Sequence, residues 1–282
     1  MNDYIHLDFA GDGGTTEIAL MVLDHYLYTR DVVKLERYLP LVTGAMDFFR
    51  LHFPTVLTTD ASGRQVETVQ FWPTQALEMF WCPFPLGDEC VVNDMPTVSS
   101  LMSLVDKTLR LVPSHLLDPS TRSTYAAFRA ALPALPLSAD QSRLAPAERY
   151  LNKTHNSETP ELYAVHPNRV FTVGTELTGN VSLAPAIAAW HANPLTKWNT
   201  GWGQGILNAA LLGLADEAWA MAVQRALYPP APGYRFQGFW SEMGGSEPTT
   251  DTGSNLNIAL HLMLLQNGDD DNDTIILFPA WP

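Results

Sequence analysis

The sequence predicts an all-α fold in which pairs of helices ring a central cleft. Along most of the 282 residues, apolar side chains recur at three- and four-residue spacing, which is the period of an amphipathic helix. No stretch alternates apolar and polar residues for long enough to indicate a strand. Long connections rich in glycine, proline and aromatic residues separate the helical stretches, and such connections usually carry a binding or catalytic surface.

The helices are expected in sequence order from one end of the chain to the other. The first covers residues 15–29, where Ile18, Met21 and Tyr26 share one face after two threonines that can cap its start. The others are expected over 35–53, 96–111, 120–132, 183–191, 203–212, 216–227 and 253–265. The long connections are 71–94, 133–160, 228–250 and 269–282. Because composition does not change sharply anywhere, we expect a single domain over 1–282.

The composition is that of a globular protein, with 46% hydrophobic and 16% charged residues. A net charge of -14 argues against nucleic acid or a membrane surface as a partner, because phosphate groups attract clustered lysine and arginine. A neutral oligosaccharide or polysaccharide makes no such demand. No apolar stretch is long enough to span a bilayer.

The N-terminal residues and the glycosylation motifs indicate where in the cell the protein is expected. The residues Met1 to Tyr4 have neither a basic nor an apolar character, so no signal peptide is expected in this chain. Three N-glycosylation motifs begin at Asn152, Asn180 and Asn272. They point to a secreted or endomembrane location for the full-length protein.

Cysteines and possible metal ligands are few. Cys82 and Cys90 either close a short disulfide loop or stay reduced. Asp269, Asp271 and Asp273 alternate like a calcium-binding loop, but the glycine and the closing glutamate of such a loop are missing. The histidines show no metal-ligand spacing. We therefore expect no metal and no cofactor.

One carboxylate lies among aromatic residues in the segment 71–81. Glu78 is accompanied there by Trp72, Trp81 and two phenylalanines. An apolar setting disfavours the ionised form of a carboxyl group, as a general acid near neutral pH requires. The alternative is a surface glutamate beside an aromatic cluster. Trp72 and Trp81, with Trp202 and Trp240, are candidates for stacking on sugar rings, although tryptophans in such folds are also core residues.

Two further polar groups are candidates. Asp251 precedes the helix expected over 253–265, where it either caps the helix or faces a cleft, and both roles are compatible. The segment 155–167 contains Glu158, Glu161 and His166. These residues either line a sugar-binding cleft or are first-turn acids favoured by a helix dipole, with His166 as a bystander.

Several blocks in this order resemble glycoside hydrolase family 95, whose members are inverting α-L-fucosidases and α-L-galactosidases, and its relatives. The blocks are His25–Asp31 with 38–41 and 44–49, Leu162–Pro167, Thr200–Trp202, Met263–Gln266 and Leu277–Pro282. Their order and approximate spacing agree with the family over nearly the whole chain.

The resemblance implies an (α/α)6 toroid that cleaves a terminal α-linked, fucose- or galactose-like sugar. Aligned on Pro73, Glu78 takes the place of the family's general acid. Counted back from Met263, Asp251 takes the place of the residue that steers water, with Asn255 in the same motif among the substrate-binding positions. Inversion requires the two carboxyl groups to lie roughly 6.5–9.5 Å apart.

The sequence departs from the family in two ways. Ser157 and Glu158 replace an Arg-His pair that helps to hold the sugar, so acceptors stand where the family has donors. The family's Asn-x-Asn motif, N-terminal β-sandwich and first barrel helix correspond to positions before residue 1, so we expect a toroid that is incomplete at its N-terminus.

Two other functions remain open. The chain is a non-catalytic, carbohydrate-binding remnant if part of the active site is missing. It is a polysaccharide lyase if the toroid serves proton abstraction beside a uronate, but that chemistry usually needs Arg or Lys, and the chain has only 16 such residues.

Overall fold

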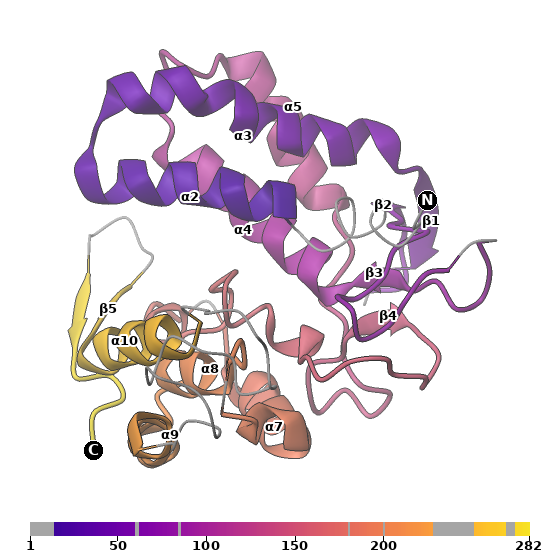
Figure 1. Ribbon diagram of the computed structural model, residues 1–282. Coiled ribbons are helices and arrows are strands. Elements are labelled where there is room, and N and C mark those ends of the chain that lie inside the picture. Colours follow the sequence, from indigo (N-terminus) through magenta and orange to yellow (C-terminus); the bar gives the residue numbers. More distant parts are fainter. Residues whose placement is uncertain are drawn as a thin grey trace. The chain divides into compact units, whose positions relative to one another are not determined.

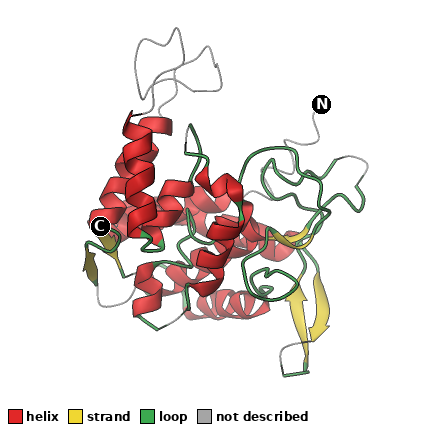
Figure 2. Cartoon of the chain, turned by 90° about the horizontal axis from the view of Figure 1, so that it is seen from below, coloured by secondary structure: helices red, strands yellow, loops and turns green. Residues whose placement is uncertain are grey.

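The computed structural model describes residues 14–59, 62–83, 86–179, 181–199, 201–227, 251–268 and 274–282. These residues are mostly helical, and their strands form three short antiparallel pairs (Figures 1 and 2). The all-α class is therefore confirmed, while the closed ring of helices stays a prediction. The described residues fall into two compact units, unit 1 within 1–137 and 145–156 and unit 2 within 138–144 and 157–282. The single domain likewise stays a prediction.

Unit 1 is built around helices whose positions the periodicity predicted to within a few residues. They are α2 (Gly14–Thr29), α3 (Val32–His52), α4 (Met95–Leu111) and α5 (Pro119–Ala131). Helices α2 and α3 lie side by side (Figure 1), and their apolar stripes meet those of α4 and α5 in one core. Leu23, Met46, Leu101 and Tyr125 are among its fully buried members.

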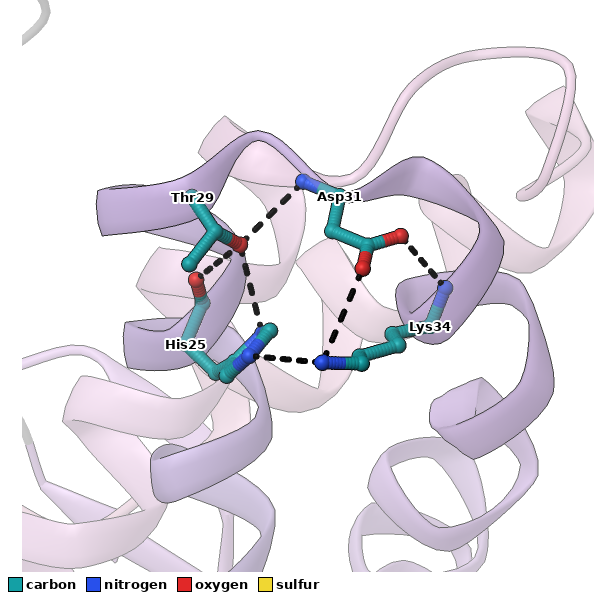
Figure 3. Close-up of polar contacts among 4 residues, drawn as sticks. All are labelled: His25, Thr29, Asp31 and Lys34. Atoms are coloured by element: carbon teal, nitrogen blue, oxygen red, sulfur yellow. Dashed lines mark hydrogen bonds and ion pairs between the residues drawn. The ribbon is translucent and has the colours of Figure 1, made fainter.

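The sharp turn between α2 and α3 is closed by a small polar network (Figure 3). The Thr29 hydroxyl donates to the His25 carbonyl at 2.7 Å and accepts the Asp31 N–H at 3.2 Å. Asp31 then caps α3 by accepting the Lys34 N–H at 3.0 Å. The Lys34 Nζ lies 3.8 Å from Asp31 Oδ2 and 3.5 Å from His25 Nε2. These bonds satisfy backbone groups that helix ends leave open, so the chain reverses within two residues.

The strands were missed because each has only three to five residues, too few to show an alternating pattern. They pair as β1 (Thr55–Thr59) with β2 (Gln65–Val69), β3 (Val92–Asp94) with β4 (Ala147–Arg149), and β5 (Leu265–Asn267) with β6 (Ile275–Leu277). The β1–β2 hairpin stands out from the helices (Figure 2) and is mostly exposed. Strand β3 is fully buried and leads directly into α4.

Unit 2 is organised around α8, whose residues are all buried. Its elements are η1 (Pro160–Leu162), α6 (Val173–Leu177), α7 (Ala184–Ala192), η2 (Pro194–Lys197), α8 (Gly205–Leu211), α9 (Ala215–Leu227) and α10 (Asp251–Leu264). Helix α8 packs against α9 and α10. At its start only glycine fits, because a Cβ on Gly205 would lie 1.7 Å from the Thr196 carbonyl oxygen. The Trp190 indole N–H also donates to the Gly205 carbonyl at 3.1 Å.

None of the described helices combines the length and the apolar character that a membrane-spanning helix needs.

Candidate functional site

Glu78 lies at the tip of a tight turn in unit 1. Thr74 pairs with Val91, and Ala76 pairs with Phe80 across the turn. Between them Leu77 is buried and adopts a left-handed backbone with φ 52°, a conformation that branched and bulky residues seldom take. Leu77 is buried, and the next residue, Glu78, is exposed.

Four residues gather at this turn, and we call them the Glu78 cluster: Glu78, Trp81, His155 and Asn156. The Asn156 amide donates to Glu78 Oε2 at 2.6 Å. The Trp81 and His155 rings stack with centroids 4.0 Å apart and planes 6° from parallel. The His155 N–H donates to the Met79 carbonyl at 3.1 Å, which ties the two chain segments together. The cluster therefore combines a carboxylate, an amide and an aromatic pair at the surface.

The surroundings of Glu78 differ from the sequence prediction of an apolar setting. Glu78 is exposed rather than buried among apolar side chains, and the Asn156 amide donates to its carboxylate. Trp81 remains 39% exposed and Trp72 38% exposed, so both are surface residues with part of the indole available to a ligand.

A disulfide and an aromatic contact hold the segment that carries the cluster. Cys82 and Cys90 form a disulfide, which resolves the two alternatives left by the sequence. Phe80 packs edge-on against Tyr150 with centroids 5.1 Å apart. Because the bridge begins at the residue after Trp81, the indole is attached to a short closed loop.

Asp94 is a buried acid that contacts the same segment through Thr74. It caps α4 by accepting the Thr97 N–H at 2.8 Å. Burial raises the pKa of Asp94 to about 7, and hydrogen bonds from Thr97 and Thr74 oppose the rise only in part. Thr74 belongs to the segment that carries Glu78, so this acid contacts the base of the turn.

In unit 2, Asp251 is the first residue of α10 rather than lying before the helix as expected. A carboxylate in the first turn is favoured by the helix dipole. One turn later, the Asn255 amide lies 3.5 Å from the Gly201 carbonyl oxygen. Trp202 follows Gly201 and packs edge-on against Trp198, with centroids 4.9 Å apart. The structure therefore groups Asp251, Asn255 and the segment 201–203 within unit 2. We call this segment the Trp202 segment.

Near the start of unit 2, Glu161 is buried and His166 is half-buried with a buried ring nitrogen. Burial lowers the pKa of His166 to about 4, and Arg169 adds like-charge repulsion, so the imidazole is neutral at pH 7. Its Nδ1 atom is buried and has no hydrogen-bond partner within the described part of the chain. Glu161 accepts from the Asn193 amide at 2.6 Å, and burial raises its pKa.

The remaining candidates are less informative. Glu158 is partly exposed. Trp240, the motifs at Asn180 and Asn272, and the alternating aspartates 269–273 lie outside the described residues. Asn152 is exposed.

Three residues that the sequence did not single out contact the candidate residues or their segments in the structure: His155, Asn156 and Arg225. Asn156 lies 78 positions from Glu78, and no local pattern reveals a contact over that separation. Glu78 and Asp251 belong to different compact units.

No model of a known protein family matches the chain, and no curated protein matches it significantly. Within the ranges that the structure describes, no group of three or more His, Cys, Asp or Glu side chains is arranged to hold a metal ion.

Proposed function

We propose that the protein is a glycoside hydrolase that removes a terminal α-linked, fucose- or galactose-like sugar with inversion. Glu78 is the general acid, and Asp251 steers the attacking water. The observation that carries this proposal is the Glu78 cluster, in which an exposed carboxylate lies beside an exposed aromatic pair.

The chemistry of the cluster suits a sugar. A sugar ring has apolar C–H faces and a rim of hydroxyl groups. The Trp81 indole offers an aromatic surface for such a face, and the Asn156 amide and the Glu78 carboxylate offer a donor and acceptors for the rim. A few polar groups beside aromatic side chains are typical of sites that bind small ligands.

The reaction divides between the two carboxyl groups. Glu78 in its protonated form gives its proton to the glycosidic oxygen as the bond from that oxygen to the anomeric carbon breaks. Asp251 takes a proton from a water that attacks the anomeric carbon from the opposite face. The products are the free sugar with inverted configuration and the alcohol. The Asn156 amide then stabilises the carboxylate that Glu78 becomes, because it donates to the charged form.

A secreted or endomembrane location fits this function. The Cys82–Cys90 disulfide is of a kind that persists in oxidising compartments. The glycosylation motif at Asn152 lies on the surface, where a glycan can be accommodated.

The proposal is tested by hydrolysis of α-fucosides and α-galactosides whose alcohol leaves poorly. Glu78→Gln is expected to lower kcat/KM at least about 100-fold, the usual contribution of general acid catalysis. Glu148→Gln is the matched control, because Glu148 is exposed and accepts from the Asn93 amide at the same 2.6 Å. Its activity is expected to equal that of the wild type.

Other outcomes identify the alternatives. If wild type and Glu78→Gln are equally inactive while calorimetry detects sugar binding that Trp81→Ala abolishes, the chain is a binding remnant. If uronate polymers yield unsaturated products that absorb ultraviolet light, it is a lyase. Either result contradicts the proposed hydrolysis.

A further inference from the structure

We infer that Arg225 is a positioning residue that links the Trp202 segment to the start of α10, where Asp251 lies. The inference rests on the proposed function for its catalytic meaning, but the physical link is testable without it. Arg225 is in the last turn of α9 and is 3% exposed.

The guanidinium group holds the backbone on both sides of Trp202. It donates to the Gly201 carbonyl and, at 3.3 Å, to the Gly203 carbonyl. Its Nη1 also lies 3.5 Å from Asn199 Oδ1. Because a guanidinium presents its donors in a rigid plane, one side chain binds two carbonyl groups at once and fixes the residue between them.

The Gly201 carbonyl is also the point of contact with α10. It receives the Asn255 amide at 3.5 Å, and a carbonyl oxygen can accept two hydrogen bonds. Asn255 lies one helical turn after Asp251. A single acceptor therefore joins α9, the Trp202 segment and the first turns of α10.

The nature of the side chain supports a positioning role. A buried charge is costly to desolvate, and an apolar residue of similar volume would pack at this point without that cost. The donors of Arg225 are directed at the two residues that flank Trp202. Movement of a reacting group by about 1 Å lowers rates by as much as roughly 100-fold, so fixing this segment has a direct kinetic consequence.

The experiment compares Arg225→Lys with Arg122→Lys by kcat, KM and thermal unfolding. Arg122 is a matched control of unit 1, because its partly buried guanidinium donates to the carbonyls of Leu109, Leu117 and Val112. A lysine ammonium lacks the planar fork in both places. We expect Arg225→Lys to lower kcat/KM about tenfold, and Arg122→Lys to change it less than about twofold at a similar loss of melting temperature. Equal kcat/KM in both variants would overturn the inference.

Asn255→Ala tests the same link without removing a buried charge. Because Arg225 and Asn255 bind one carbonyl, their effects on kcat/KM are expected to be coupled, so that the double variant is less impaired than the product of the single effects. Simple multiplication of the two effects would mean that Arg225 acts independently of α10, which contradicts the inference.

Hydrogen exchange separates a failure of the inference from a failure of the proposed function. In Arg225→Lys we expect faster amide exchange in the segments 198–204 and 251–258, and no such change there in Arg122→Lys. If the wild type hydrolyses no glycoside, the proposed function is wrong, and this exchange result still decides the link. Unchanged exchange in both segments would refute it.

Discussion

Replacing Asp94 by asparagine is expected to stabilise the protein at neutral and alkaline pH and to have little effect in acid. Asp94 is fully buried, and burial raises its pKa from the ordinary 3.8 to about 7. Between these two values the folded protein holds a proton that the unfolded chain has released. The wild type therefore loses stability as the pH rises through this range.

The magnitude follows from the size of the shift. A rise of about 3 units, at about 1.4 kcal/mol per unit, gives a loss of up to about 4 kcal/mol above pH 7. Asparagine avoids this loss because it does not ionise. Its oxygen still accepts the Thr97 N–H that caps α4. Its amide can donate to the Thr74 hydroxyl oxygen, which in the variant leaves the Thr74 proton for the Val91 carbonyl alone.

The assay is urea unfolding of both proteins between about pH 4 and pH 8. The variant should gain free energy of unfolding over the wild type as the pH rises, and the gain should level off above about pH 7. Asp118→Asn is the control with the opposite sign, because Asp118 is an exposed cap whose pKa is lowered by hydrogen bonds from Ser120 and Thr121. A difference between wild type and Asp94→Asn that does not change with pH would refute the reasoning.

Three further predictions concern the candidate site. In Asn156→Asp, a carboxylate replaces the amide that donates to Glu78, so kcat/KM should fall about tenfold because a hydrogen bond to a charged group is lost. If kcat/KM is unchanged, Asn156 does not contact the catalytic acid. Replacing Cys82 and Cys90 by serine should lower the free energy of unfolding by about 2–3 kcal/mol, as expected for a short loop, and weaken sugar binding in calorimetry. If this variant binds sugar as tightly as the wild type, Trp81 is not part of the site. His166→Gln should be more stable than the wild type by roughly 3 kcal/mol near pH 4 but not at pH 7, because the folded wild type resists protonation as the pH falls from about 6.5 to about 4. Equal acid unfolding of both proteins would contradict this.

The helices were predictable because their signal is local. The apolar period predicts a helix over 96–111, and α4 runs over Met95–Leu111, one residue from the predicted start. A strand of three residues has no comparable signal. Strand β3 is held by pairing with β4, where Val92 lies opposite Arg149, and that pairing depends on chain segments far apart in the sequence.

The site was predictable only in part, because some of its contacts join chain segments that are far apart in the sequence. The aromatic segment and its one carboxylate identified Glu78 and Trp81 as candidates, but the folded chain leaves Glu78 exposed rather than buried among aromatic side chains. Asn156 reaches it through a long-range contact. Arg225 resembles any basic residue in the last turn of a helix, which the helix dipole favours, and only the folded chain shows that it binds the carbonyls around Trp202.

The role of Glu78 as the general acid is tested most directly by the dependence of hydrolysis on the leaving group. With glycosides whose alcohol leaves poorly, Glu78→Gln should lose about 100- to 10,000-fold in kcat/KM, because the glycosidic oxygen is no longer protonated. With dinitrophenyl glycosides, whose phenolate leaves without a proton, the loss should be far smaller. A loss of equal size for every leaving group, or no loss at all, would contradict the assignment.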